Sequence, residues 1–212
     1  MATIKKAIIP VAGLGTRFLP LSKVVSKEFW PLADRPVIQY IVEEALKSGI
    51  KEIIFVNRPE KKAVLNYFQS DQKLIKLLRE RKRQNLVKEL KTLEKISKNI
   101  VLRQVFQKQP LGDGHAVLQA ENFIGKNPWA VAWADDVIES KTPCFKQLIK
   151  VFNKYKKPVI ALAKVPKESF PSYGMMAGKK IGPKTYQLTQ IVEKPKIEDS
   201  PSNLAIVGRY VL

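Results

Sequence analysis

Apolar residues along the chain follow a pattern that predicts strands alternating with helices. Residues 4–12 form a continuous apolar run ending in glycines, which is typical of a parallel strand buried on both faces. Over residues 37–46 the apolar side chains instead recur every three or four positions, so a helix is expected, with Gly49 at its end. The same reasoning predicts strands at 52–57, 100–106, 129–134 and 159–165, and helical segments at 59–100, 114–123 and 143–155.

This alternation favours right-handed crossover connections and hence an α/β fold with a mostly parallel central sheet. Beyond Pro166 the pattern changes to short apolar runs separated by Gly and Pro. Such runs indicate an antiparallel C-terminal addition on one side of the sheet. Its strands are expected at 173–177, 186–192 and 204–212.

The charge narrows the classes of partner. Lys and Arg total 38 and Asp and Glu 19, so the net charge is +19. This excess suits nucleic acid, an anionic membrane surface or a phosphorylated small substrate. No run of about 20 apolar residues is present, which argues against a membrane-spanning helix. The single Cys144 and single His115 exclude an internal disulfide and a His/Cys zinc cluster, and they favour a reducing, cytoplasmic compartment.

A glycine-rich segment, VAGLGTR at residues 11–17, follows the first predicted strand, where α/β sheets place ligand loops. Its glycines allow backbone N–H groups to approach phosphates, and Arg17 can bind phosphate in a bidentate manner. The dinucleotide fingerprint fails because it needs glycine at Phe18, and a Walker A loop fails as well. Lys23 and Lys27 could add phosphate counter-charges. The alternatives are a tight strand exit without ligand and solvated surface lysines.

A second candidate loop, QKQPLGDGHA at residues 107–116, joins a predicted strand to a predicted helix. The amide of Gln107 carries a donor and an acceptor, which suits the edge of uracil or thymine. Gly112 and Gly114 would let a flat ligand lie against the backbone. A turn with helix-capping glycines is the alternative, and His115 alone is more typical of a structural hydrogen bond than of a catalytic base.

Acidic residues at strand ends are the third candidate. Asp135 and Asp136 follow an apolar strand, where paired carboxylates can hold Mg²⁺. Capping of a following helix is the alternative. Glu193 and Lys194 end another predicted strand and could combine an acceptor for sugar hydroxyls with a cation for phosphate. A surface ion pair is the alternative there.

Together and in this order, these segments resemble the bacterial UTP-glucose-1-phosphate uridylyltransferases, or UDP-glucose pyrophosphorylases, of the sugar-nucleotidyltransferase superfamily. The resemblance implies a three-layer Rossmann-like nucleotidyltransferase fold, with residues 1–212 as a single nucleotidyltransferase domain. It extends from Lys6 to the last residue and rests on KAIIPVAGLGTRFLP, KEFWP, PVIQYIVEEALKSGI, QPLGDGHAVLQA, ADD, SYGMM, VEKP and PSNLAIVGRYVL.

The resemblance also implies a reaction and a role for each candidate residue. A sugar phosphate oxygen of glucose-1-phosphate would attack the α-phosphorus of UTP in line, giving UDP-glucose and pyrophosphate without a protein nucleophile. By resemblance, the nucleotide would contact the backbone of Ala12, Gly13 and Gly15, the triphosphate would bind Arg17 and Lys27, uracil would be read by Gln107 and Gly112, Mg²⁺ would bind Asp135, and glucose-1-phosphate would bind Gly174, Glu193 and Lys194.

Three departures from the family pattern keep other functions open. The loop at residues 23–31 lacks a usual proline and gains Trp30, and Ala134 replaces a proline before the metal aspartate. Family members also continue past GRYVL with a second metal-side aspartate and helices for oligomer contacts. We therefore expect a C-terminally truncated member with weak turnover, and a homo-oligomer formed through an uncovered apolar face.

Two other functions follow from these departures and from the charge. A truncated, non-catalytic binder of nucleotide or sugar phosphate would keep the motifs without turnover. A nucleic-acid-binding protein is favoured less, because the basic residues are spread and the densest run, residues 79–83, has no interleaved aromatic side chains.

Overall fold

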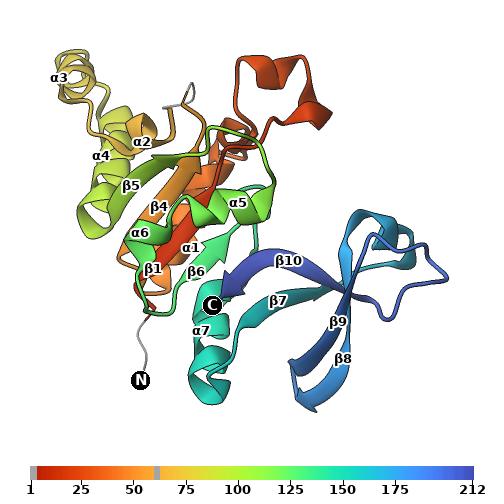
Figure 1. Ribbon diagram of the computed structural model, residues 1–212. Coiled ribbons are helices and arrows are strands. Elements are labelled where there is room, and N and C mark those ends of the chain that lie inside the picture. Colours follow the sequence, from red (N-terminus) through yellow and green to blue (C-terminus); the bar gives the residue numbers. More distant parts are fainter. Residues whose placement is uncertain (1–3, 60–62) are drawn as a thin grey trace.

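The main sheet mixes parallel and antiparallel strands in the computed structural model, which describes residues 4–59 and 63–212. Its strands are β1 (Lys6–Pro10), β4 (Glu52–Asn57), β5 (Val101–Phe106), β6 (Ala130–Ala132), β7 (Val159–Lys164), β8 (Gly174–Gly182), β9 (Thr185–Glu193) and β10 (Leu204–Val211). They follow the order β5-β4-β1-β6-β10-β8-β9, and β7 also pairs with β10. Strands β5, β4, β1 and β6 are parallel, whereas β10 runs antiparallel to both β6 and β7 (Figure 1). The mostly parallel sheet with an antiparallel C-terminal addition is therefore confirmed.

The helices differ more from the expectation than the strands do. The single helical stretch expected at 59–100 is broken at Asp71, whose side chain caps a new helix, and again near Lys82, whose φ is +56°. Its first residues include 60–62, which lie outside the described residues. The helix expected at 114–123 is also divided in two. The helices are α1 (Val37–Lys47), α2 (Ala63–Phe68), α3 (Gln72–Glu80), α4 (Gln84–Asn99), α5 (Asp113–Leu118), α6 (Glu121–Ile124) and α7 (Cys144–Tyr155).

Short elements complete the chain between these helices and strands. A two-stranded ribbon leads into α1, and 3-10 turns follow the first strand and precede β8. None of the helices in the described residues is long and apolar enough to cross a membrane. The short elements are η1 (Thr16–Phe18), η2 (Leu21–Lys23), η3 (Lys27–Phe29), β2 (Pro31–Leu32), β3 (Arg35–Pro36) and η4 (Lys167–Ser172).

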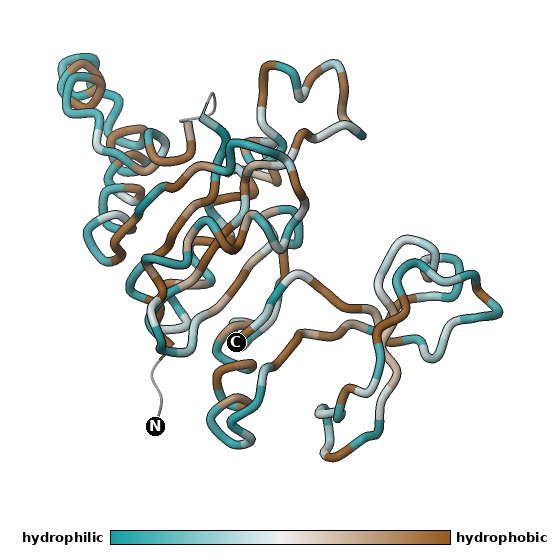
Figure 2. Tube along the Cα trace, viewed as in Figure 1, coloured by the Kyte–Doolittle hydropathy of each residue, from teal (hydrophilic) through white to brown (hydrophobic). Residues whose placement is uncertain are grey.

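Successive side chains of the central strands point to opposite faces of the sheet. Helices pack on both faces, so the fold has three layers and the core has two parts. In β1, Ile9 packs into the cluster formed with α1 and α7, whereas Ile8 packs into the cluster formed with α5 and α6. In β4, Phe55 and Ile54 divide in the same way. Each fully buried side chain of this size contributes about 1.5–3 kcal/mol. Figure 2 shows the result: the tube is mostly hydrophobic along these central strands and largely hydrophilic in the segments around them.

A buried ion pair joins helix α1 to strand β10. The side chain of Arg209 in β10 is fully buried, and its Nε and Nη2 donate to Glu44 Oε2 of α1 at 3.1 and 3.0 Å. The other carboxylate oxygen of Glu44 accepts from the backbone N–H of Phe145, at the start of α7, at 3.0 Å. The guanidinium also donates to the carbonyls of Trp133 and Asp136, at 3.2 and 2.8 Å. One cation therefore connects α1, α7, β10 and the loop that follows β6.

Gly208 gives the first prediction, because this strand and that loop are close at its position. A Cβ at Gly208 would lie 2.6 Å from Asp136 Oδ2 and 2.7 Å from Trp133 Cβ. We expect Gly208→Ala to lower the free energy of unfolding by about 1–3 kcal/mol, the usual cost of overpacking. In the control Gly114→Ala, inside α5, the new Cβ would have no neighbour within 4 Å, so the stability should be unchanged or slightly higher. Urea unfolding measures both, and equal stability of the two variants would contradict this packing.

Candidate functional site

The glycine-rich loop folds back on itself directly after β1. Gly15 has φ +65°, in the left-handed region, and a Cβ there would lie 3.0 Å from the Cβ of Ser22. Glycine is therefore required for both backbone conformation and space. At Gly13 a Cβ would lie 3.7 Å from Cε and 3.9 Å from Nζ of Lys27. The end of the Lys27 side chain thus lies directly beside Gly13.

Lys27 contacts an acidic residue from the other end of the sequence. Its Nζ lies 2.7 Å from Oδ2 of Asp135, which follows β6. Parallel strands β1 and β6 are neighbours, so the loops after both strands meet at the same edge of the sheet. Exposed fractions of 22% and 43% for the Lys27 and Asp135 side chains leave both groups accessible. The sequence-predicted Gly13, Lys27 and Asp135 are therefore brought together.

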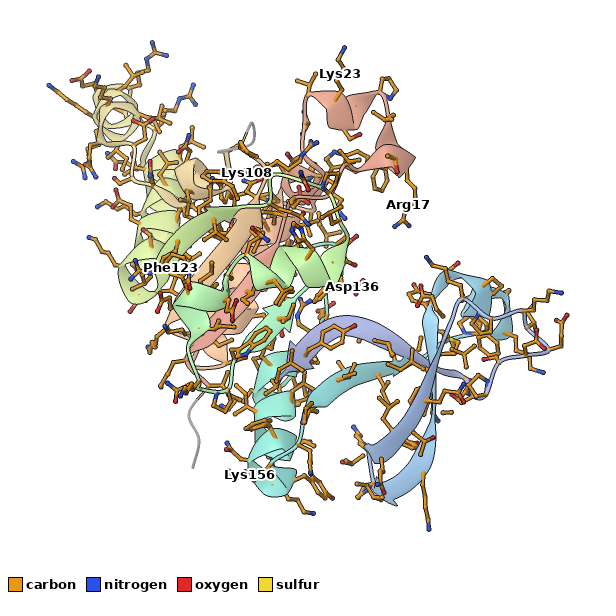
Figure 3. The ribbon with its side chains drawn as sticks, in the orientation of Figure 1. Arg17, Lys23, Lys108, Phe123, Asp136 and Lys156 are labelled. Carbon is orange, nitrogen blue, oxygen red and sulfur yellow. The ribbon has the colours of Figure 1, made fainter. Side chains whose placement is uncertain are left out.

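The charges around Asp135 determine its protonation. Burial raises the pKa of this carboxyl, but the hydrogen bond and charge of Lys27, together with the charge of Arg17, outweigh burial and hold it below its ordinary value. The carboxylate is therefore ionised at neutral pH. Figure 3 shows Arg17 pointing from its loop toward the side of the molecule that carries Asp136, whereas Lys23 points away from it. Lys23 is therefore not part of this group.

The two aspartates at the end of β6 differ in their surroundings. Asp136 Oδ2 accepts a hydrogen bond from the Gly208 backbone N–H at 2.7 Å. One oxygen of this carboxylate is thus engaged inside the fold, and a metal role for Asp136 beside Asp135 stays a prediction. Helix capping is wrong, because the next helix begins only at Cys144. Within residues 4–59 and 63–212, no group of three or more His, Cys, Asp or Glu side chains could hold a metal ion.

The second candidate loop is closed by the side chain of Gln107. This residue is 6% exposed, and its Nε2 donates to the Gly112 carbonyl at 3.1 Å and lies 3.0 Å from His115 Nδ1. Helix α5 begins directly after Gly112, whose φ is +90°. The amide nitrogen therefore makes its hydrogen bonds within the loop.

The third group lies at the base of the β8–β9 hairpin. Gly174 and Glu193 are register partners, and a Cβ at Gly174 would lie 3.1 Å from Glu193 Oε2. The neighbouring Lys194 has φ +47°, and its Nζ lies 3.4 Å from Glu193 Oε1. The three residues are thus adjacent, and the two charged side chains form a largely exposed ion pair. Figure 1 shows this hairpin standing beside the core, away from the loop that carries Arg17.

Sequence reasoning missed Trp133 and Tyr210, which lie beside the candidate site. Trp133 connects the loop after β6 to the loop before α5. Trp133 Nε1 donates to Asp113 Oδ2, the first residue of α5, at 3.2 Å, and the Trp133 ring lies 5.1 Å from that of Tyr210. Alternation was the available signal: Ala130, Ala132 and Ala134 are buried in one core cluster, so the residues between them are expected on the other side of the chain.

Known proteins match this chain over almost its whole length. Residues 6–212 match the family model described as nucleotidyl transferase. Relatives from Staphylococcus haemolyticus and Staphylococcus epidermidis, both named UTP--glucose-1-phosphate uridylyltransferase, are each 44% identical over 215 residues. These alignments cover 100% of this chain and 73% of each relative.

Solved structures show the same fold. A UDP-glucose pyrophosphorylase complexed with UDP-glucose superimposes with a TM-score of 0.89 at 37% identity, covering 99% of this chain and 76% of that one. A UTP-bound UGPase from Acinetobacter baumannii gives a TM-score of 0.90 at 37% identity, covering 99% and 74%. The resemblance inferred from the sequence motifs is thereby confirmed.

The Lys27–Asp135 contact gives the second prediction. Lys27→Met removes the hydrogen bond and the charge that lower the pKa of Asp135, whereas the burial that raises this pKa remains. We therefore expect the pKa of Asp135 to rise. Lys23→Met, which removes a lysine pointing away from the site, should leave that pKa unchanged. Carboxyl ¹³C NMR during acid titration measures both. An unshifted Asp135 in Lys27→Met would show that the contact does not control this carboxyl.

Proposed function

Because the chain belongs to the nucleotidyl transferase family, we propose that it is a cytoplasmic, Mg²⁺-dependent enzyme that forms UDP-glucose and pyrophosphate from UTP and glucose-1-phosphate. The observation that carries this proposal is the contact of Lys27 with Asp135 beside Gly13, at the carboxyl edge of the parallel strands. A cation for phosphate and an ionised carboxylate for a metal are thus placed next to Gly13, where the backbone carries no side chain. The names of the relatives supply the substrates.

The chemistry of Asp135 suits the proposed metal. Mg²⁺ prefers oxygen ligands and is usually held by one or two carboxylates together with water and substrate phosphates. Asp135 offers an ionised and accessible carboxylate, so we assign the metal to it. When bound, Mg²⁺ would neutralise charge on the phosphates. Lys27 would then be released from Asp135 and could contact the triphosphate.

The remaining residues bind and orient the substrates. The backbone N–H groups of Ala12, Gly13 and Gly15 would hold the nucleotide, as glycine-rich loops hold phosphates. Arg17 and Lys27 would stabilise the negative charge that develops at the α-phosphorus. On the sugar side, the absence of a Cβ at position 174 leaves room beside a carboxylate for hydroxyl groups, with a cation next to it. We assign glucose-1-phosphate to Gly174, Glu193 and Lys194.

The reaction would need no covalent intermediate. A phosphate oxygen of the sugar phosphate forms a bond to the α-phosphorus, and the bond from that phosphorus to the bridging oxygen of the β-phosphate breaks. Pyrophosphate leaves with the electron pair of that bond. Catalysis then consists of alignment and charge stabilisation, which explains why a serine or cysteine nucleophile is not required.

The third prediction concerns turnover. In a coupled assay of pyrophosphate release, we expect activity with UTP, glucose-1-phosphate and Mg²⁺, and much less with ATP in place of UTP. Lys27→Ala should lower kcat by about 10²–10³-fold, the effect of losing one preorganised donor. Lys23→Ala should match the wild type. UTP binding without pyrophosphate release would instead support the non-catalytic binder.

The fourth prediction concerns the metal. Asp135→Asn should raise the Mg²⁺ concentration needed for UTP binding by at least about tenfold, because even loss of an outer contact of a metal site costs about that much. Asp136→Asn is the matched control, since an asparagine oxygen can still accept from the Gly208 N–H. Titration calorimetry of UTP at several Mg²⁺ concentrations compares the two variants. The same Mg²⁺ requirement in both would rule out Asp135 as the ligand.

A further inference from the structure

Helix α3 lies at the periphery of the fold. Figure 1 shows it at the outer end of the hairpin that it forms with α4, on the opposite side of the molecule from the β8–β9 hairpin. Arg17 and Asp136, which mark the candidate site, lie away from this helix (Figure 3). Of the 9 residues of α3, only Ile75 is buried. Most of the surface of α3 therefore faces solvent.

The helix and the turn that follows it carry a dense positive charge. Residues 72–83 contain six Lys and Arg residues against one acidic residue, Glu80, so their net charge is +5. All six cations are exposed, and within residues 4–59 and 63–212 none of their side chains forms a hydrogen bond or an ion pair. This charge is therefore available to an external partner. The six cations are Lys73, Lys76, Arg79, Arg81, Lys82 and Arg83.

Apolar side chains are exposed on the same helix. Leu77 is 41% exposed and Leu74 is 39% exposed. Residues three and four positions apart are neighbours on a helix, so Leu77 lies beside Leu74 and between Lys73 and Arg81. Successive residues are separated by about 100°, so Leu77 also lies nearly opposite the buried Ile75. The helix thus presents an apolar strip between two cations, on the side away from its packed residue.

Of the partners that suit positive charge, an anionic bilayer fits this surface best. Nucleic acid would use the cations for its phosphates, but single strands bind by stacking on aromatic rings, and residues 72–99 contain none. The two leucines would have no role in such a complex. A bilayer uses both kinds of side chain, because anionic headgroups attract Lys and Arg while apolar side chains of an amphipathic helix enter the boundary between headgroups and acyl chains.

We propose that α3 and the turn at residues 81–83 dock on the surface of an anionic lipid bilayer. Leu74 and Leu77 enter the interface, and the neighbouring cations contact lipid headgroups. The docked helix lies away from Arg17 and Asp136, so a nucleotide can still reach the candidate site. The proposal goes beyond the proposed function and does not depend on it.

Sedimentation with vesicles tests the role of the charges. The vesicles contain phosphatidylcholine, either alone or mixed with phosphatidylglycerol. We expect the wild type to bind only the mixed vesicles, and to bind them less as salt is added. Changing Arg81, Lys82 and Arg83 together to Gln should lower the partition coefficient by about 100-fold, because each cation near an anionic surface contributes a factor of about five.

A matched variant controls for net charge. Lys179, Lys180 and Lys184 are exposed near the tip of the β8–β9 hairpin, and changing all three to Gln removes the same charge from another part of the molecule. This variant should bind the mixed vesicles much as the wild type does, because salt screens distant charges.

A second pair of variants tests the apolar contact. Leu77→Gln should lower the partition coefficient by about three- to tenfold, because part of a leucine side chain is no longer transferred from water. The control is Leu188→Gln in β9, because Leu188 is 42% exposed and so nearly matches Leu77. Its binding should equal that of the wild type.

The outcomes distinguish a bilayer from other partners. Absence of wild-type binding to the mixed vesicles would overturn the proposal, and so would equal losses in the two triple variants. Unchanged binding of Leu77→Gln would also overturn it, and tight binding of a DNA duplex would then assign the surface to nucleic acid. If the triple variant of the turn does not fold, as judged by circular dichroism, the comparison of Leu77→Gln with Leu188→Gln still decides. UTP binding should be the same in the α3 variants and the wild type, so its failure would concern the proposed function alone.

Discussion

The ion pair between Glu44 and Arg209 is the constraint on which the geometry of the candidate site depends. Charges taken out of water lose hydration energy, and a buried pair often gains little stability over apolar residues of similar size. Removal of one partner, however, leaves an unpaired buried charge that costs about 3–5 kcal/mol. Arg209 is fully buried, and besides the neighbouring Gly208 carbonyl its guanidinium donates to three groups: Glu44 Oε2, which accepts from two nitrogens, and the carbonyls of Trp133 and Asp136. The fold therefore tolerates little displacement of the loop after β6.

That loop gives two adjacent aspartates opposite tasks. Asp136 is held by the Gly208 N–H, and its carbonyl by Arg209, so this residue anchors the loop to β10. Asp135 is left accessible and faces Lys27, which lies in η3. Every N–H of the buried Arg209 guanidinium has an acceptor, whereas the outer pair can exchange one partner for a ligand. Such a division between a fixed support and an exchangeable contact is suited to phosphate chemistry.

The sequence was informative where local patterns decide the structure. The strand at 52–57 was predicted with the bounds that β4 has, because four consecutive apolar residues between polar ends give a clear pattern. The stretch at 59–100 was wrong as one helix, since the three- and four-residue spacing continues across the breaks at Asp71 and Lys82. Lys27 and Asp135 were both named as candidates, but their contact joins residues 108 positions apart and only the strand order reveals it. The buried Arg209 could not be predicted, because its partners come from distant elements.

The central claim is that Glu44 and Arg209 act as one unit in holding these elements together, and a double-mutant cycle tests it most directly. The proteins are the wild type, Glu44→Met, Arg209→Met and the double variant, each unfolded in urea. Each single change should cost about 3–5 kcal/mol, and the double variant should cost at least about 1 kcal/mol less than the sum of the two. Additive costs would contradict the claim, because they would show that the two charges contribute to stability independently.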